Sequence, residues 1–195
     1  MTEKGSLNMK IILASKSPRR KELLEKLGLE FEIRSAPQEE EMDPNKDVVS
    51  EVGRVSAAKA LSVPASDDEL VISSDTVVDL DGVVLGKPGS EEEAKQMLAA
   101  LSGRGHVVHT AVTVKKGDRI RTEVSSTAVW FRELTDDEIA AYVRSGEPMD
   151  KAGAYGAQGL GSLLVQRIDG DFFTVMGLPV CTLGQILKEF GVEIL

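Results

Sequence analysis

The fold begins with I-I-L-A-S-K-S-P-R-R, residues 11–20, where a short apolar strand pattern runs directly into the cationic start of a helix pattern. Ser17 is predicted to cap this helix, and Pro18 suits its first position because the N–H that proline lacks would be unpaired there. The free amides of the first turn and the charges of Arg19 and Arg20 favour a bound phosphate. A well-capped surface helix with solvated basic residues is the alternative interpretation.

Apolar runs alternate with helix-period segments beyond this stretch, which is typical of an α/β fold. The early helices require crossovers between parallel strands, whereas the Asp81-Gly82 turn and the pair of long strands after it predict antiparallel hairpins. We therefore expect a single α/β domain with a mixed sheet. The pattern predicts strands over 9–14, 31–35, 70–78, 83–85, 105–115 and 119–132, and helices over 18–27 and 48–61.

Two further helix starts and a last hairpin complete the pattern. Ser90 and Thr135 are each followed three positions later by glutamate, which is the capping-box spacing. The segments 163–168 and 171–175 are predicted to pair as a hairpin joined at Asp169-Gly170, and residues 179–190 to form a closing helix.

Composition narrows the class of protein. The 195 residues are 42% hydrophobic, enough for one globular domain without a linker. The formal net charge of -9 opposes nonspecific attraction to nucleic acid or to an anionic membrane, and aromatic residues, which provide stacking surfaces for bases, make up only 4%. Cys181 is the single cysteine, and no apolar run approaches the roughly 20 residues that span a bilayer. We expect a cytoplasmic protein whose polar residues 1–8 form a frayed start.

A carboxylate stands in the middle of an apolar strand pattern, V-I-S-S-D-T-V-V-D, residues 71–79. Burying Asp75 beside Thr76 is costly unless a cation, a metal or hydrogen bonds meet the charge. A solvated Asp75 on an edge strand is the alternative. Lys87 follows in G-K-P, where a solvated loop lysine is as good an explanation as a functional one.

Glycines recur in D-K-A-G-A-Y-G-A-Q-G, residues 150–159, and again at Gly161. They would let the backbone approach a ligand closely or adopt positive φ, so this segment is predicted to be a binding loop rather than a flexible connection. The amide of Gln158 can both donate and accept, which suits the imide edge of uracil or thymine. The chain contains neither a dinucleotide-binding glycine fingerprint nor a P-loop motif.

Seven short motifs together resemble the Maf family of nucleoside triphosphate pyrophosphatases. The similarity runs from Met9 nearly to the C-terminus, and the G-A-Y-G-x-Q-G form of the loop resembles the branch that acts on dTTP and UTP. The motifs are A-S-K-S-P-R-R-K-E-L-L at 14–24, A-A-K-A at 57–60, S-S-D-T-V-V at 73–78, G-K-P at 86–88, L-S-G-R at 101–104, E-P-M-D-K-A-G-A-Y-G-A-Q-G at 147–159 and G-L-P at 177–179.

The resemblance implies one domain over residues 9–195, with an elongated mixed sheet flanked by helices and an active-site cleft at strand ends. It also implies a role for individual positions. Asp75 would be the catalytic proton acceptor or a metal ligand. Glu40 would be a second metal ligand, although a solvated acidic run over 39–41 is the alternative there. Substrate binding and specificity would fall to Ser15, Arg19, Arg20, Lys59, Thr76, Lys87 and Gln158.

The implied reaction is water attack at the α-phosphorus of a nucleoside triphosphate, with pyrophosphate leaving. Mg²⁺ fits the oxygen-rich arrangement that such a substrate presents, with Mn²⁺ or Co²⁺ as alternatives. The resemblance also implies a homodimer, and the acidic net charge predicts no nucleic-acid or membrane partner. The competing functions are a non-catalytic nucleotide-sensing regulator linked to cell division and an inosine triphosphate-type pyrophosphatase.

Overall fold

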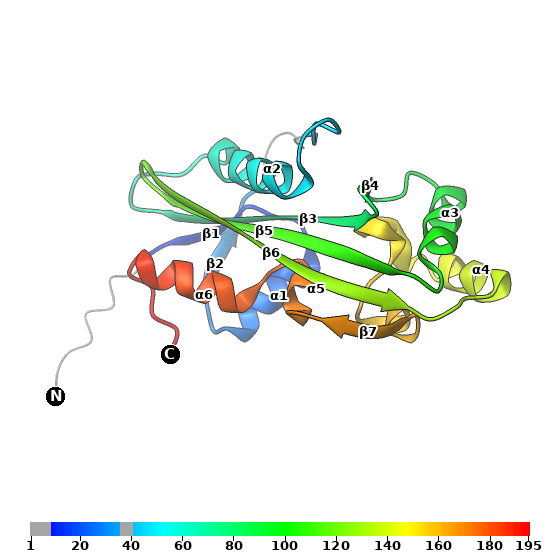
Figure 1. The fold of residues 1–195 in the computed structure, drawn as a ribbon. Helices are drawn as coiled ribbons and strands as arrows, with labels where there is room; N and C mark the ends of the chain where they lie inside the picture. Colours follow the sequence, from blue (N-terminus) through cyan, green and yellow to red (C-terminus); the bar gives the residue numbers. More distant parts are fainter. Residues whose placement is uncertain (1–8, 36–40) are drawn as a thin grey trace.

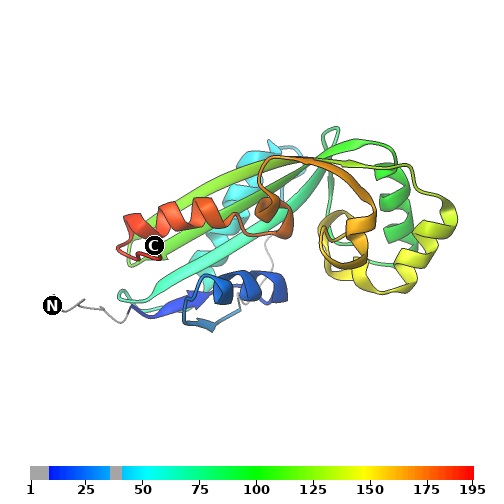
Figure 2. The same cartoon turned by 90° about the horizontal axis from the view of Figure 1, so that it is seen from below.

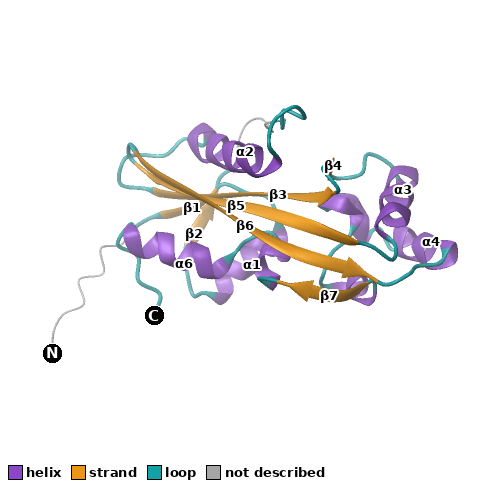
Figure 3. Ribbon diagram, viewed as in Figure 1, coloured by secondary structure: helices purple, strands orange, loops and turns teal. Residues whose placement is uncertain are grey.

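The computed structural model describes residues 9–35 and 41–195, which form an elongated mixed sheet with helices on both faces and at one end (Figures 1 and 3). The α/β expectation is therefore confirmed. The predicted frayed start, 1–8, lies outside the described residues. The strands are β1 (Ile11–Leu13), β2 (Phe31–Ile33), β3 (Leu70–Leu80), β4 (Val83–Leu85), β5 (Gly105–Lys116), β6 (Arg119–Phe131) and β7 (Val165–Asp169).

The helices lie in two groups along the sheet. Helix α2 covers one face, whereas α1, α5 and α6 cover the other face and α3 and α4 lie at the far end (Figure 1). Their bounds are α1 (Pro18–Lys26), α2 (Val48–Ser62), α3 (Glu91–Leu101), α4 (Asp136–Arg144), α5 (Phe172–Met176) and α6 (Val180–Glu189), and three 3-10 turns lie at η1 (Glu147–Asp150), η2 (Ala152–Ala154) and η3 (Gly159–Leu163).

The strand order is β2-β1-β3-β5-β6-β7, with β4 paired to the distal part of β3. Strand β1 is parallel to both β2 and β3, as crossovers through α1 and α2 require, and the remaining pairs are antiparallel. The mixed sheet predicted from the sequence is thus confirmed. The two longest strands, β5 and β6, set the length of the molecule (Figure 1).

Two hydrophobic clusters occupy the same face of the sheet at its two ends. One lies under α1 and α6, around fully buried Leu24, Leu183 and Leu187. The other lies under α3 and α4, around Leu98 and Phe131. Figure 2 shows α6 at the end that holds both termini and α4 at the opposite end. Between the two clusters, this face of the sheet carries the polar side chains of Ser74, Thr76 and Thr110.

The local signals for helix starts are mostly confirmed. The side chains of Ser90 and Thr135 accept bonds from the N–H groups of Glu93 and Glu138, and Thr135 forms the complete capping box. Ser17 differs, because it occupies the N-cap position of α1 without a side-chain bond to the helix. Its own N–H instead donates to Ser15 Oγ at 3.2 Å, so Ser15 organises this turn.

Only the first strand of the predicted last hairpin is confirmed, and the second is wrong. Strand β7 forms over Val165–Asp169, but the segment predicted as its partner, 171–175, belongs to helix α5. Asp171 caps this helix by accepting from Phe173 N–H at 3.0 Å and Thr174 Oγ1 at 3.0 Å, and Gly177 ends it with φ 101°. These two caps outweigh the strand propensity of the aromatic and β-branched residues between them.

Across residues 9–35 and 41–195, no helix is both long enough and apolar enough to cross a membrane.

Candidate functional site

A gap in one edge of the sheet defines the candidate site. Strand β1 pairs with β3 only over residues 70–72, and β4 takes up the same edge only from Val78. Among the described residues, the β3 edge over 73–77 therefore has no neighbouring strand. Asp75 and Thr76 lie in this gap and project from opposite faces of the strand.

A cleft with a volume of about 410 Å³ lies over the gap. Its walls come from α1, from the end of α2, from the segment after β4 and from the glycine-rich loop, residues 150–161. Every predicted site residue within the described ranges lines this one cleft: Ser15, Arg19, Arg20, Lys59, Asp75, Thr76, Lys87 and Gln158.

Arg20 is fixed in the floor of the cleft by three hydrogen bonds. Its guanidinium donates to Gly177 O at 2.8 Å, to Thr76 Oγ1 at 3.0 Å and to Ser15 Oγ at 3.2 Å. Burial lowers the pKa of Arg20 to about 10, and the charge of Asp75 opposes this shift. The guanidinium is therefore charged at neutral pH and held in one orientation before any ligand binds.

A belt of buried hydroxyls, which was not predicted from the sequence, supports Arg20. Ser74 Oγ donates to Gly177 O at 2.9 Å, while Thr110 Oγ1 donates to Thr174 O at 2.7 Å and lies 3.1 Å from Thr76 Oγ1. These bonds tie the end of α5 to β3 and β5. Two hydroxyl residues at alternate positions, 74 and 76, on an otherwise apolar face of the strand were the available signal.

Asp75 forms an ion pair with Lys59, which lies in the last turn of α2. The side chains are 16% and 19% exposed respectively, so the pair is largely shielded from solvent. The cost of placing a carboxylate in an apolar strand is thus offset by a cation, as burial requires. The pair joins the acidic centre of the cleft to the helix on the opposite face of the sheet.

Arg19 connects the two sides of the cleft. Its Nη1 donates to Asp150 Oδ2 at 3.1 Å, and Lys151 Nζ donates to Asp150 Oδ1 at 2.6 Å. Burial raises the pKa of Asp150, but the bond from Lys151 and the charges of both cations outweigh it and leave the pKa below its ordinary value. The Asp150 carboxylate therefore forms ion pairs with both Arg19 and Lys151 at the mouth of the cleft.

The glycine-rich loop packs closely against the distal part of β3. Gly153 has φ 67°, its N–H donates to Gly86 O at 3.0 Å, and a Cβ there would lie 2.8 Å from a methyl carbon of Val78. This contact fixes the segment that leads into Lys87. Farther along the loop, the side chain of Gln158 lines the cleft and forms no hydrogen bond with the described residues.

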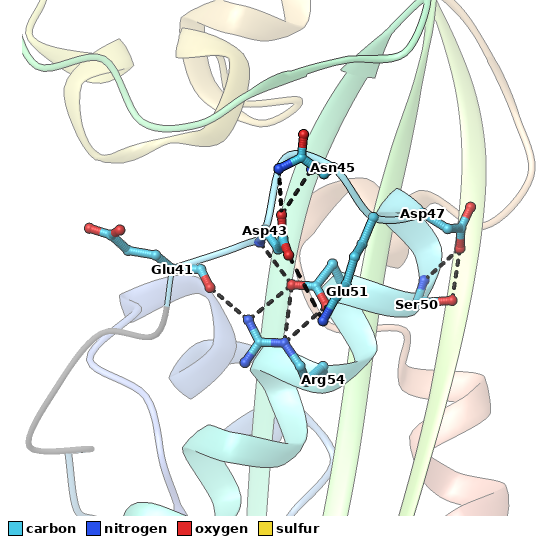
Figure 4. A network of polar contacts seen from close by, with 8 residues as sticks. Glu41, Asp43, Asn45, Asp47, Ser50, Glu51 and Arg54 are labelled. Atoms are coloured by element: carbon cyan, nitrogen blue, oxygen red, sulfur yellow. Dashed lines mark hydrogen bonds and ion pairs between the residues drawn. The ribbon is translucent and has the colours of Figure 1, made fainter.

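Glu40, the second predicted metal ligand, lies outside the described residues. The chain resumes at Glu41, whose carbonyl accepts from Arg54 at 2.6 Å. Figure 4 shows Arg54 and the buried Glu51 facing this segment, and Glu51 also accepts from Asp43 N–H at 2.9 Å. These contacts fix the start of the segment that follows Glu40 against helix α2.

The described residues contain no cluster of three or more His, Cys, Asp or Glu side chains arranged to hold a metal ion. A Mg²⁺ ion bound largely through substrate phosphates and water needs only one or two protein carboxylates. Asp75 is a carboxylate that lines the cleft, so the described residues are compatible with such a shared ion.

A family model described as Maf-like protein matches residues 10–190. A dTTP/UTP pyrophosphatase of Bacillus velezensis is 47% identical over 188 residues, which cover 96% of this chain and 100% of that protein. A dTTP/UTP pyrophosphatase of Aquifex aeolicus is 47% identical over 184 residues, which cover 94% of this chain and 96% of that protein.

A solved structure of a HAM1 protein from Coxiella burnetii is similar over 93% of this chain and 99% of that chain, with a TM-score of 0.47 and 16% identity.

Proposed function

Because the chain belongs to the Maf family, we propose that it hydrolyses dTTP and UTP to the nucleoside monophosphate and pyrophosphate. One observation supports this most strongly: cations, a carboxylate and an amide without a partner among the described residues line a single cleft of about 410 Å³. A nucleoside triphosphate needs these three elements for its phosphates, its attacking water and its base.

The triphosphate is proposed to lie along the α1 side of the cleft. Arg20 is already oriented, Arg19 and Lys87 add charge, and the free amides at the start of α1 contribute the positive end of the helix dipole. Cationic groups here would stabilise the charge that develops on the leaving pyrophosphate.

Asp75 is proposed to accept the proton of the attacking water. The water oxygen bonds to the α-phosphorus, the bond from that phosphorus to the bridging oxygen breaks, and pyrophosphate leaves with the electron pair. Lys59 holds the Asp75 carboxylate by their ion pair. Thr76, bonded to Arg20, is proposed to contribute to substrate choice together with Arg19 and Gln158.

Mg²⁺ is the proposed cofactor, with Mn²⁺ or Co²⁺ as alternatives, and Asp75 and Glu40 are its proposed ligands. When bound, such an ion neutralises charge on the phosphate oxygens. We also propose that residues 9–195 form one domain and that the protein is cytoplasmic. We further propose that it is a homodimer, and light scattering on the purified chain would test this oligomeric state.

The deciding experiment measures pyrophosphate release from dTTP, UTP, CTP, ITP and methylated pyrimidine triphosphates in the presence of Mg²⁺. We expect release from dTTP and UTP well above release from CTP and ITP, and loss of release when the metal is chelated. Binding of UTP without turnover would instead favour the nucleotide-sensing regulator. A maximum on ITP would favour the inosine triphosphate-type activity.

A further inference from the structure

Gln158 lines the cleft, yet its own side chain does not determine where it lies. It forms no hydrogen bond with the described residues. Its position must therefore come from the backbone on either side of it, between Gly156 and Gly161.

The carboxylate of Glu147 binds that backbone on the C-terminal side of Gln158. Glu147 Oε2 accepts from Leu160 N–H at 3.0 Å, and Oε1 accepts from Gly161 N–H at 3.0 Å. Oε1 also accepts from the hydroxyl of Tyr142 at 2.9 Å. A single carboxylate thus satisfies three donors.

Tyr142 binds the backbone on the N-terminal side. Its hydroxyl oxygen accepts from Gly156 N–H at 3.1 Å while its proton goes to Glu147. Burial raises the pKa of Tyr142, which keeps this hydroxyl protonated and able to donate. The two sides of the loop are therefore joined through one Tyr142–Glu147 pair.

Two glycines make this closure possible. A Cβ on Gly161 would lie 2.1 Å from Gly156 O and 2.6 Å from Tyr142 Oη, and a Cβ on Gly159, which has φ 68°, would lie 2.7 Å from Glu147 Oε2. From the sequence, these glycines are predicted to let the backbone approach a ligand closely or adopt positive φ. At these two positions the close approach is to Glu147, Tyr142 and the loop itself.

We propose that Glu147, acting with Tyr142, is a positioning residue that sets the place of Gln158 and thereby the preference for uracil and thymine. Glu147 does not line the cleft, so it acts through the loop. This inference rests on the proposed function.

The test replaces Glu147 by glutamine, which keeps the shape but exchanges an acceptor oxygen for a donor NH₂, so that one loop N–H loses its partner. We expect kcat/KM for UTP to fall about tenfold, mostly because KM rises. The ratio of kcat/KM for UTP to kcat/KM for ITP should therefore become smaller. Inhibition by inorganic tripolyphosphate, which probes only the cationic wall, should stay within twofold. Glu92→Gln, on an exposed side chain of α3, is the matched control and should leave all three quantities unchanged.

An equal loss for UTP and ITP, with weaker tripolyphosphate inhibition, would assign Glu147 a general structural role and overturn the inference. An unchanged UTP-to-ITP ratio would overturn it as well. If Glu147→Gln does not fold, Tyr142→Phe removes the Gly156 acceptor without changing the ring, and the same narrowing is expected.

Failure of the proposed function itself would look different, because the unaltered protein would then release no pyrophosphate from UTP or dTTP above the level seen with ITP. Calorimetric binding of UMP still decides the inference in that case. Glu147→Gln should weaken UMP binding about tenfold, and equal binding to the unaltered and variant proteins would overturn the inference.

Discussion

The two walls of the cleft hold their functional side chains by different means. On the α1 wall, Arg20 is fixed by its own guanidinium, which donates to a carbonyl and two hydroxyls. On the opposite wall, Gln158 is placed by its backbone, which the Tyr142–Glu147 pair holds, and its amide has no partner among the described residues. On the α1 wall, Arg20 is oriented before a ligand binds. On the opposite wall, the amide of Gln158 keeps its donor and acceptor available for a ligand.

This difference matches the two parts of a nucleoside triphosphate. The triphosphate is the same in every substrate, so a preorganised cationic wall serves them all and saves the cost of ordering side chains on binding. The base differs between substrates, and discrimination requires polar groups that only the correct base satisfies. Changes on the α1 wall should therefore affect all nucleotides, and changes on the loop wall should affect their ranking.

Asp75 lies between the walls, and changing it should produce the largest effect. In Asp75→Asn we expect kcat to fall by about 10² to 10⁴, the range for loss of a general base, because the amide cannot take the proton of the attacking water. KM for UTP should change less than fivefold, since both walls remain. Pyrophosphate release measures the first quantity, and circular dichroism checks folding. Near-normal turnover would remove Asp75 from the chemistry.

Acid should lower the stability of the end of the molecule that supports the loop wall. His106 is 4% exposed, its Nε2 lies 2.7 Å from Tyr155 Oη, and its Nδ1 has no partner in the described part of the chain. Burial lowers the pKa of His106 from 6.5 to about 4. Between these values the unfolded chain binds a proton that the folded chain does not.

The free energy of unfolding should therefore fall by about 3 kcal/mol as the pH falls from 6.5 towards 4. Above pH 6.5 this contribution to stability is fully present. His106→Gln cannot titrate, so its loss of stability over this interval should be smaller by that amount. Denaturant unfolding at a series of pH values measures it. Parallel curves for both proteins would contradict the expectation.

Gln158→Glu tests base recognition directly. A carboxylate cannot donate to a carbonyl oxygen of uracil, so kcat/KM for UTP and dTTP should fall about 10-fold to 100-fold, with a smaller fall for ITP. Kinetics with all three nucleotides measure the ranking, and inhibition by tripolyphosphate is the control for charge repulsion. An unchanged ranking would show that Gln158 does not read the base.

Asp150→Asn should produce the smallest effect, and in the opposite direction. The substitution releases Arg19 from an ion pair at the mouth of the cleft, where such pairs contribute up to about 1 kcal/mol. KM for UTP should therefore fall about threefold with kcat unchanged, and raising the salt concentration should reduce the difference between variant and unaltered protein. A rise in KM would instead mean that Asp150 assists binding.

The sequence predicted most of the elements because their signals are local. The apolar run before Ser15, the Asp81-Gly82 turn and the capping glutamates after Ser90 and Thr135 each act within a few residues. Around 171–175 the sequence predicts a strand where the structure has helix α5. The aspartate cap and the glycine end of this helix lie so close together that they enclose only one or two turns.

The sequence by itself determined which side chains are available and where the helix beside them begins. The tertiary structure decided how they meet, because the site depends on strand β1 ending after three residues and leaving the β3 edge open. Arg20 then reaches Gly177 across 157 positions, and Arg19 reaches Asp150 across 131. No periodicity encodes contacts at such separations, since they arise only when the sheet and its two hydrophobic clusters pack around the gap.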